Sequence, residues 1–283
     1  MVVEQFAKLH NITTGVCDAA PIDAGRLASP FVPFVTEDLR KRTVPEMILP
    51  KAGSIVVIGV PYPETKIKEP CAGSAQGVLS SLALHEDYHI RVKSLLRKLA
   101  DEMKLWYGSF RYKILADSPT LEERILAYRA GIGFFGRNGL IISQKFGSRF
   151  NIGCMLTDIP KISFINETTL PECPPNCRKC TDACPTNALC GEYLDARKCI
   201  SYLTQKDILS PEEESLMGKH LYGCDICMDA CPFNSPQPVI YANPEEWINM
   251  SDEDFKREYG KTAMMWRGAD ILRRNARVVL SNI

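Results

Sequence analysis

The clearest hydrophobic signal in the chain is the run S-I-V-V-I-G-V at 54–60. Its β-branched residues, between prolines on both sides, predict a buried strand. Alternating apolar positions, or short apolar runs bounded by turn residues, predict further strands. These are expected at 14–17, 110–115, 140–143 and 150–157.

Apolar residues three and four positions apart predict helices around these strands. The longest helical stretch carries an apolar stripe made of Leu95, Leu96, Leu99 and Met103. Thr36 and Thr120 are the expected N-caps of two shorter helices. The helices are expected at 2–10, 36–42, 76–104, 121–130, 251–259 and 268–281.

Eight of the twelve cysteines are candidate cluster ligands: seven form two similar runs, and Cys199 lies between the runs. The first reads C-P-P-N-C-R-K-C-T-D-A-C-P at 173–185, and the second reads C-D-I-C-M-D-A-C-P from Cys224. Both close with C-x2-C-x3-C-P, the spacing of bacterial two-cluster ferredoxins, in which the cysteine before proline ligates the other cluster. We therefore assign one [4Fe–4S] cluster to Cys173, Cys177, Cys180 and Cys231, and the other to Cys184, Cys199, Cys224 and Cys227.

The alternatives for these cysteines are structural zinc sites or disulfides. Zinc does not require the repeated Cys-Pro, and disulfides would need a secreted chain. Cys173 is the least regular ligand, because the first run opens C-x3-C where C-x2-C is usual. The four cysteines that are not assigned to a cluster are expected to be small buried or partly exposed thiols. They are Cys17, Cys71, Cys154 and Cys190.

Composition narrows the class of protein. With 283 residues, 45% of them hydrophobic and 24% charged, the chain is expected to be globular with two domains or more. Basic and acidic residues balance at 34 each, so any RNA contact must use a local patch of charge.

The sequence contains no apolar run of about 18 residues, so no membrane span is predicted. The N-terminus lacks the layout of a signal peptide, and cysteine-rich chains without one are expected in the cytoplasm.

These patterns together predict an α+β protein. An N-terminal α/β domain is expected at 1–165, a ferredoxin-like domain with two [4Fe–4S] clusters at 166–237, and a short helical tail at 238–283.

A glycine-rich loop, G-I-G-F-F-G at 131–136, formally matches a dinucleotide-binding fingerprint. That fingerprint should follow a strand and open a helix, whereas this loop follows a predicted helix and leads into a strand. Glycines that let the backbone approach a large flat ligand fit Gly131, Gly133 and Gly136 better.

Several phrases together resemble the epoxyqueuosine reductase family, the cobalamin-dependent iron–sulfur enzymes of queuosine biosynthesis in tRNA. They are T-G-V at 14–16, R-K-R-T-V-P-E-M-I-L-P at 40–50, D-Y-H at 87–89, A-D-S-P-T-L-E-E-R-I-L-A-Y-R-A-G-I-G-F-F-G-R-N-G at 116–139, K-C-I-S-Y-L-T at 198–204 and Y-G-C-D-I-C-M-D-A-C-P-F-N at 222–234. The ferredoxin phrases alone are shared by many proteins, but their combination with the segment around Asp117 is specific.

The resemblance implies a role for several residues. The N-terminal domain would bind cobalamin, Asp117 would donate a proton to the substrate, and Arg42 and Arg124 would lie near the cofactor. The loop carrying Gly131, Gly133 and Gly136 would pass close to the corrin ring. From the residues alone, Asp117 before Ser-Pro is typical of a turn or helix-capping aspartate, and only the match to the family motif favours a proton donor. It can donate a proton only if burial keeps it protonated.

The resemblance also implies how the cofactor is bound and what the partners are. Asp87-Tyr88-His89 begins a D-x-H-x-x-G cobalt-ligand pattern, but position 92 is valine. A base-off cobalamin with no protein histidine ligand is therefore expected, and His89 is expected to be a surface or core histidine. The expected partners are the anticodon loop of tRNA as substrate and an electron donor such as flavodoxin or ferredoxin.

The chain departs from the family pattern in places. Phe134 stands where tryptophan is usual, Arg137 stands where lysine is usual, and the first cysteine run has an extra residue. The helical-repeat region that helps the family hold tRNA is nearly absent, which leaves the basic residues of the tail as candidates for RNA contact. Those candidates are Arg267, Arg273, Arg274 and Arg277, with Lys219 and His220; a solvated helix face is the alternative.

Three functions therefore compete at this point. The first is an epoxyqueuosine reductase acting on tRNA, the second a related corrinoid reductase of a small molecule, and the third a ferredoxin-type electron-transfer protein. The third predicts no tightly bound cobalamin, and the second predicts cobalamin without affinity for tRNA.

Overall fold

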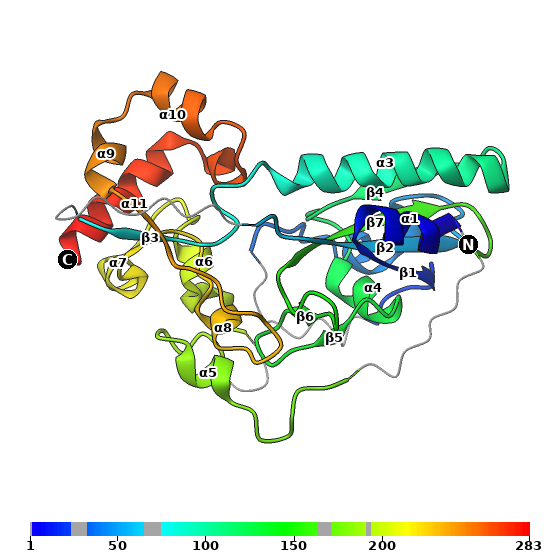
Figure 1. The fold of residues 1–283 in the computed structure, drawn as a ribbon, viewed down its shortest axis with the longest axis horizontal. Coiled ribbons are helices and arrows are strands. Elements are labelled where there is room, and N and C mark those ends of the chain that lie inside the picture. Colours follow the sequence, from blue (N-terminus) through cyan, green and yellow to red (C-terminus); the bar gives the residue numbers. More distant parts are fainter. Residues whose placement is uncertain (1, 24–32, 65–74, 163–170, 191–193) are drawn as a thin grey trace. The chain divides into compact units, whose positions relative to one another are not determined.

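A computed structural model describes residues 2–23, 33–64, 75–162, 171–190 and 194–283. The chain forms two compact units (Figure 1). The first unit comprises Met1–Pro61 and Tyr88–Cys177, and the second comprises Tyr62–Asp87 and Arg178–Ile283. The predicted boundary between 165 and 166 falls outside the described residues, and the predicted tail at 238–283 packs within the second unit.

The first unit is built on a four-stranded antiparallel sheet in the order β1-β2-β7-β4. Its strands are β1 (Thr13–Asp18), β2 (Ser54–Pro61), β4 (Tyr112–Leu115) and β7 (Phe150–Thr157). Strand β2 is the apolar run predicted from sequence, and it occupies a central position in the sheet. Because side chains alternate along a strand, Val56 and Ile58 enter one core while Ile55 and Val57 enter the core on the opposite face.

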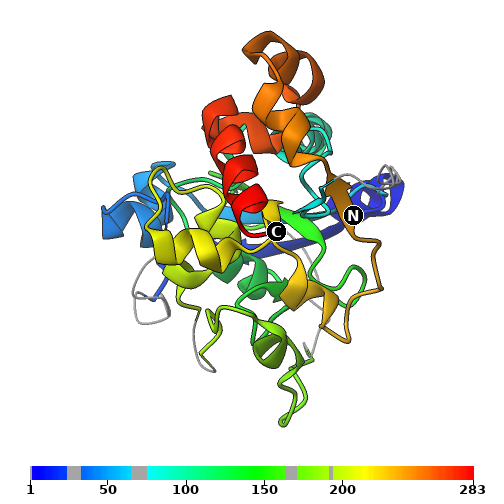
Figure 2. The ribbon, with the colours of Figure 1, turned by 90° about the vertical axis from the view of Figure 1, so that its left-hand side faces the viewer.

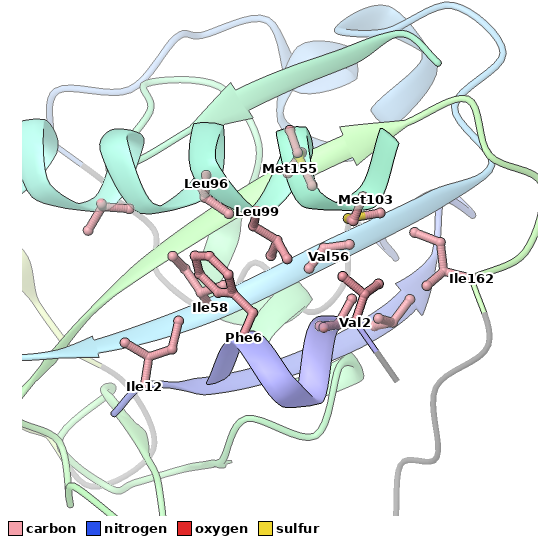
Figure 3. Close-up of a cluster of buried hydrophobic side chains, with 14 of the residues drawn as sticks. Val2, Phe6, Ile12, Val56, Ile58, Leu96, Leu99, Met103, Met155 and Ile162 are labelled. Carbon is pink, nitrogen blue, oxygen red and sulfur yellow. The ribbon is translucent and has the colours of Figure 1, made fainter. Parts of the chain in front are cut away.

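Helices cover both faces of this sheet. Helices α1 (Val2–His10) and α3 (Tyr88–Tyr107) lie on the face of Val56 and Ile58 (Figure 3). Their apolar stripes meet there because apolar residues recur every three or four positions. The labelled side chains of this core include Phe6, Leu96, Leu99 and Met103. The short helix α4 (Glu123–Arg129) packs on the other face, and the hairpin of β5 (Phe134–Phe135) and β6 (Ile141–Ile142) follows it in the chain.

The starts of three predicted helices differ from the structure. The helix predicted at 76–104 begins only at Tyr88, because residues 77–79 form a strand. Helix α2 (Leu39–Thr43) is capped by Asp38, whose carboxylate accepts the N–H groups of residues 40 and 41, and a 3-10 turn η2 (Pro45–Met47) follows. Helix α4 begins after Glu122, while the Thr120 hydroxyl instead meets that of Ser118 at 2.6 Å.

The second unit contains a three-stranded sheet that the sequence patterns missed. Strand β3 (Gly77–Leu79) pairs in parallel with β8 (His220–Tyr222) and antiparallel with β9 (Ile240–Ala242). Helix α11 (Ala269–Ser281) packs on β8 and on α9 (Pro244–Asn249), as the red and orange helices of Figure 2 show. The core between them also takes residues from α10 (Asp252–Tyr259) and the 3-10 turn η4 (Ala263–Arg267).

The cysteine-rich segment consists of short helical turns. They are α5 (Lys179–Ala183), η3 (Ala196–Lys198), α6 (Ile200–Leu203), α7 (Pro211–Met217) and α8 (Ile226–Asp229). The buried side chain of Asn275 links α11 to this segment and to β8, since its amide donates to the carbonyl oxygens of Thr204 and Leu221, each at 2.8 Å.

None of the described helices combines the length and the apolar character that crossing a membrane requires.

Candidate active site and cluster ligands

The carboxylate of Asp117 lies at the end of β4 and meets two side chains from the first turn of α3. The Tyr88 hydroxyl donates a hydrogen bond to Asp117 Oδ2, and His89 Nε2 lies 4.0 Å from the same oxygen. The Tyr88 and His89 rings stack with their centroids 4.2 Å apart. Sequence reasoning assigned neither ring to this site, although both belong to the D-Y-H phrase that carried part of the resemblance.

Burial of Asp117, which proton donation was predicted to need, is not provided by the described chain. The side chain is 71% exposed, because the loop carries it beyond the last residue of β4. A second carboxyl group, that of the partly buried Glu123, contacts the backbone of this loop. Its oxygens accept the N–H groups of Asp117 and Ser118 at 2.9 and 3.0 Å, and burial raises its pKa to about 8.

Arg42 and Arg124, both predicted to lie near a cofactor, converge on Glu122. Arg42 donates through Nε and Nη2 to Glu122 Oε1, and its side chain is only 14% exposed. Arg124 Nη2 lies 3.7 Å from Glu122 Oε2, and its Nη1 donates to the Gly139 carbonyl at 3.0 Å. Glu122 is therefore an organising residue that sequence reasoning missed. Two guanidinium groups against one carboxylate leave a positive charge at this end of α4.

The glycine loop follows α4 and leads into the β5–β6 hairpin, as predicted. Gly131 has φ +74°, the left-handed conformation that ends many helices. A Cβ atom at Gly133 would lie 2.3 Å from the Ile142 carbonyl oxygen, and one at Gly136 would lie 2.5 Å from the Ile142 side chain. The close approach that these two glycines permit is therefore to β6 of the same chain.

The two C-x2-C-x3-C-P runs adopt the same local structure. In each, one cysteine precedes a short helix by two residues, the next is the second residue of that helix, and the last follows its end. Helices α5 and α8 contact each other. This order applies to Cys177, Cys180 and Cys184 around α5 and to Cys224, Cys227 and Cys231 around α8.

Four thiols of the second unit lie close enough to influence one another electrostatically. Burial is the main cause that raises the pKa of Cys224 to about 12, and the charges of Cys199 and Cys184 contribute to this value. The pKa of Cys227 is also raised by burial and by Cys224, Cys199 and Cys184 among its neighbours. At Cys184, burial is outweighed by hydrogen bonds from the Thr186 hydroxyl and from backbone N–H groups, so its pKa is lowered. Thiolates crowded in this way need a cation to neutralise them.

The cysteines outside the runs differ in exposure. Cys154 is buried in β7, Cys17 is partly buried in β1, and Cys190 is exposed. Burial raises the pKa of both Cys17 and Cys154, which keeps them as thiols. Cys71 lies outside the described residues.

The arginines proposed from sequence to form one RNA-binding face are mostly engaged within the second unit. Arg273 donates to the Met250 carbonyl at 2.9 Å and pairs with Asp252 and Asp270, while Arg274 donates to the Lys206 carbonyl at 2.8 Å. Arg267 pairs with Asp207. His220 is half-buried, and burial lowers its pKa. Of the six candidates, Arg277 and Lys219 are exposed.

This difference predicts opposite effects for two arginines on the same helix. Arg273→Gln should lower the melting temperature by about 2–4 °C, because it loses contacts that join α11 to Met250 and Asp252. Arg277→Gln should leave the melting temperature unchanged. In a tRNA-binding titration it should lower affinity and reduce the slope of log K against log salt by about 1. Equal melting temperatures for the two variants would contradict the structural role of Arg273.

Comparison with known families agrees with both halves of this description. The family model described as "Epoxyqueuosine reductase QueG, DUF1730" matches residues 42–118, and the model described as "4Fe-4S double cluster binding domain" matches residues 173–234. The first match begins at Arg42 and ends one residue after Asp117. The second contains all eight assigned cluster ligands, the seven cysteines of the two runs and Cys199.

Curated relatives and solved structures extend the likeness over most of the chain. The epoxyqueuosine reductases of Bacillus cereus and Staphylococcus aureus are 34% and 36% identical to it over 265 residues, which is 88% of this chain and 69% of each relative. The structure of epoxyqueuosine reductase from Streptococcus thermophilus superimposes with a TM-score of 0.87 at 30% identity, covering 99% of this chain and 80% of that one. A crystal structure of an epoxyqueuosine reductase with an epoxyqueuosine-modified tRNA-Tyr stem loop matches with a TM-score of 0.86 at 30% identity and with the same coverage. The chain therefore belongs to the epoxyqueuosine reductase family.

Proposed function

We propose that this chain reduces epoxyqueuosine to queuosine in tRNA, using two [4Fe–4S] clusters and cobalamin. The observation that carries the proposal is the exposed carboxyl group of Asp117, held beside Tyr88 and His89 on a loop of fixed geometry. An exposed acid that is anchored by its neighbours can meet a substrate, whereas a capping aspartate would use its carboxylate within the chain. In this structure the Asp117 carboxylate accepts no backbone N–H of α4.

The cluster ligands follow from the two cysteine runs and from the electrostatic coupling of the thiols. We assign Cys184, Cys199, Cys224 and Cys227 to one cluster, as the cysteine spacing predicts. These four thiols lie within one unit, and the charge of Cys184 raises the pKa of the other three. An iron–sulfur cluster supplies the positive charge that would keep them deprotonated. The other cluster takes the remaining cysteines of the runs, Cys173, Cys177, Cys180 and Cys231. Each cluster passes electrons singly, as delivery from a flavodoxin or ferredoxin requires.

The residues around α4 fit a cobalamin site. The side-chain amide nitrogen of Asn138, in the glycine loop, is buried and has no hydrogen-bond acceptor among the described residues. It is a donor that a ligand amide or phosphate oxygen would satisfy. Arg124, 40% exposed and partly neutralised by Glu122, would hold an acceptor group of the same ligand, and Arg42 would keep Glu122 in place. When bound, cobalamin supplies a strongly reducing cobalt centre for the epoxide carbon.

The chain's histidines fit a cofactor without a protein ligand to cobalt. His89 Nε2 faces the Asp117 carboxylate at 4.0 Å, and its ring stacks on Tyr88. An imidazole that contacts a carboxylate in this way interacts with the proton-donating group and not with a metal ion. This geometry supports a cofactor without a histidine ligand from position 89, and we propose that cobalamin binds in the base-off form.

The chain's own contribution to the reaction is a proton at the departing oxygen. Converting an epoxide to an alkene releases the oxygen as water and consumes two electrons and two protons. Asp117 would deliver a proton to that oxygen, and the Tyr88 hydroxyl would fix which carboxyl oxygen faces the substrate. A bound base that covers the Asp117 carboxyl group would remove water from it and favour the protonated acid.

The substrate is proposed to be the anticodon stem loop of tRNA, as in the relative that was crystallised with a modified stem loop. A modified base must leave the loop stack to reach Asp117. The net charge of zero offers no general attraction, so exposed residues such as Arg277 and Lys219 would supply local contacts to phosphate.

The test is turnover of the purified chain. Anaerobically prepared protein, reconstituted with iron, sulfide and cobalamin, should convert epoxyqueuosine in a tRNA stem loop to queuosine when supplied with a low-potential reductant. Nucleoside analysis by mass spectrometry measures the product. Protein that retains both clusters and cobalamin but leaves the epoxide intact would overturn the proposal, and a stem loop that fails to bind even at low salt would favour a small-molecule substrate.

A further inference from the structure

The loop that carries Asp117 holds an unfavourable backbone conformation. Asp117 has φ +48°, in the left-handed region that residues other than glycine seldom adopt. Such a conformation persists when surrounding groups fix it. Two tethers reach this loop from outside: Glu123 accepts the N–H groups of residues 117 and 118, and Thr36 N–H donates to the Pro119 carbonyl at 2.8 Å.

The Glu123 tether acts directly on the orientation of Asp117. One carboxylate oxygen accepts the Asp117 N–H at 2.9 Å, and the other accepts the Ser118 N–H at 3.0 Å. Two bonds from one rigid planar group to consecutive N–H groups fix the peptide between them. That peptide determines the direction in which the Asp117 side chain leaves the backbone.

We infer that Glu123 is the positioning residue of this reaction: its carboxylate holds the backbone of residues 117 and 118 in the observed conformation and so sets where the proton-donating carboxyl group points. The inference rests on the proposed role of Asp117. It adds a residue that does not touch the substrate and acts only through the backbone of residues 117 and 118.

The strength of the tether depends on the charge of Glu123. Burial raises its pKa to about 8, the neighbouring Asp117 raises it further, and the loop N–H groups and Lys93 of α3 lower it. The buried Cys154 thiol of β7 also faces it. A protonated carboxyl group keeps one acceptor oxygen and turns the other into a donor, so one N–H loses its partner. The loop should therefore be held more firmly as the pH rises through about 8 and released as the pH falls below it.

Hydrogen–deuterium exchange of the full chain, with fragmentation that separates the amides of residues 117 and 118, measures the tether directly. After correction for the intrinsic pH dependence of exchange, the wild type should protect these amides about tenfold more than Glu123→Gln at pH 9. This difference should vanish near pH 6. Glu213→Gln is the matched control, because Glu213 accepts the Ser210 N–H at 2.9 Å in the second unit. It should leave the 117–118 amides unchanged.

Turnover supplies the second readout. Glu123→Gln should lower kcat by about tenfold with an unchanged KM for the stem loop, and it should remove the wild-type dependence of kcat on pH near 8. If the variant does not fold, hydrogen–deuterium exchange of the wild type at several pH values still tests the inference. Protection of the 117–118 amides that is independent of pH between 6 and 9 would overturn it. Wild-type exchange and kcat in a folded Glu123→Gln protein would also overturn it. Protection that follows Glu123 while Asp117 variants retain full turnover would instead confirm the tether and refute the proposed role of Asp117.

Discussion

Replacing Asp117 by asparagine should lower the rate of epoxyqueuosine reduction by about 10²–10⁴-fold, the usual cost of losing a general acid. The substitution removes only the transferable proton. It should leave iron content, cobalamin binding and affinity for the stem loop unchanged, because the Asp117 side chain is 71% exposed and packs in no core. Single-turnover formation of queuosine, followed by mass spectrometry of the nucleosides, measures the loss.

Asparagine is the informative substitution because of the backbone. At φ +48°, asparagine is one of the few residues that the left-handed region tolerates, whereas alanine would strain the loop. The asparagine side-chain oxygen can still accept the hydrogen bond that Tyr88 donates. A loss of rate in Asp117→Asn therefore reports chemistry rather than a displaced loop.

Asp158→Asn is the control for this prediction. Asp158 follows β7 and accepts the backbone N–H and the Nε of Arg111, beside the opposite end of β4 from Asp117. The change is chemically identical and lies in the same unit. Asp158→Asn should remove only the exposed ion pair with Arg111 and should leave turnover unaltered. Wild-type rates in Asp117→Asn would return that residue to the role of a turn aspartate.

The parts of the fold that could be predicted from sequence are those with a long periodic pattern. The run at 54–60 became the central strand β2, and the stripe of Leu96, Leu99 and Met103 became the buried face of α3. Strand β3 could not be predicted, because three residues are too few for a period and its partners lie more than 140 positions along the chain. Its place depends on tertiary pairing alone.

Some residues of the candidate site could likewise be predicted from sequence, and others could not. Asp117 and the cysteine runs could be found because each belongs to a contiguous phrase of recognisable spacing. Tyr88 and His89 contact Asp117 from 29 and 28 residues away, respectively, and nothing in their local sequence shows that contact. Glu122 and Glu123 resemble ordinary first-turn acids of a helix, so their separate tasks of pairing arginines and holding the loop appear only in three dimensions.

The arginines of the tail have contacts that the sequence pattern could not predict. Their density on one helix favoured a shared RNA-binding face, but the pattern of a single helix does not reveal acids and carbonyls brought close by folding. Arg273 contacts Met250 and Asp252, which precede it by about 20 positions, and Arg274 reaches Lys206 from 68 positions away. Charge on a helix is evidence of binding only after such internal partners are known.

Removing the Cys199 thiol should produce the largest loss of function. Cys199 lies outside both C-x2-C-x3-C-P runs, at the junction of η3 and α6. Its assignment comes from the sequence, and the structure supports it, since the charge of Cys199 raises the pKa of Cys224 and Cys227. Cys199→Ala should reduce iron from about eight to about four per chain. Turnover should fall to background, because a broken electron path cannot be replaced by binding or proton transfer.

The control for Cys199 is Cys190→Ala, in the same segment of the chain. Cys190 is exposed, its thiol donates to the Asn187 carbonyl at 3.3 Å, and its exposure does not suit a ligand of a buried cluster. This variant should keep about eight irons and wild-type turnover. Anaerobic iron and sulfide analysis, with the electron paramagnetic resonance signal of the reduced protein, measures both variants. Two intact clusters in Cys199→Ala would show that another residue completes the set, and a loss of iron in Cys190→Ala would place that residue at position 190.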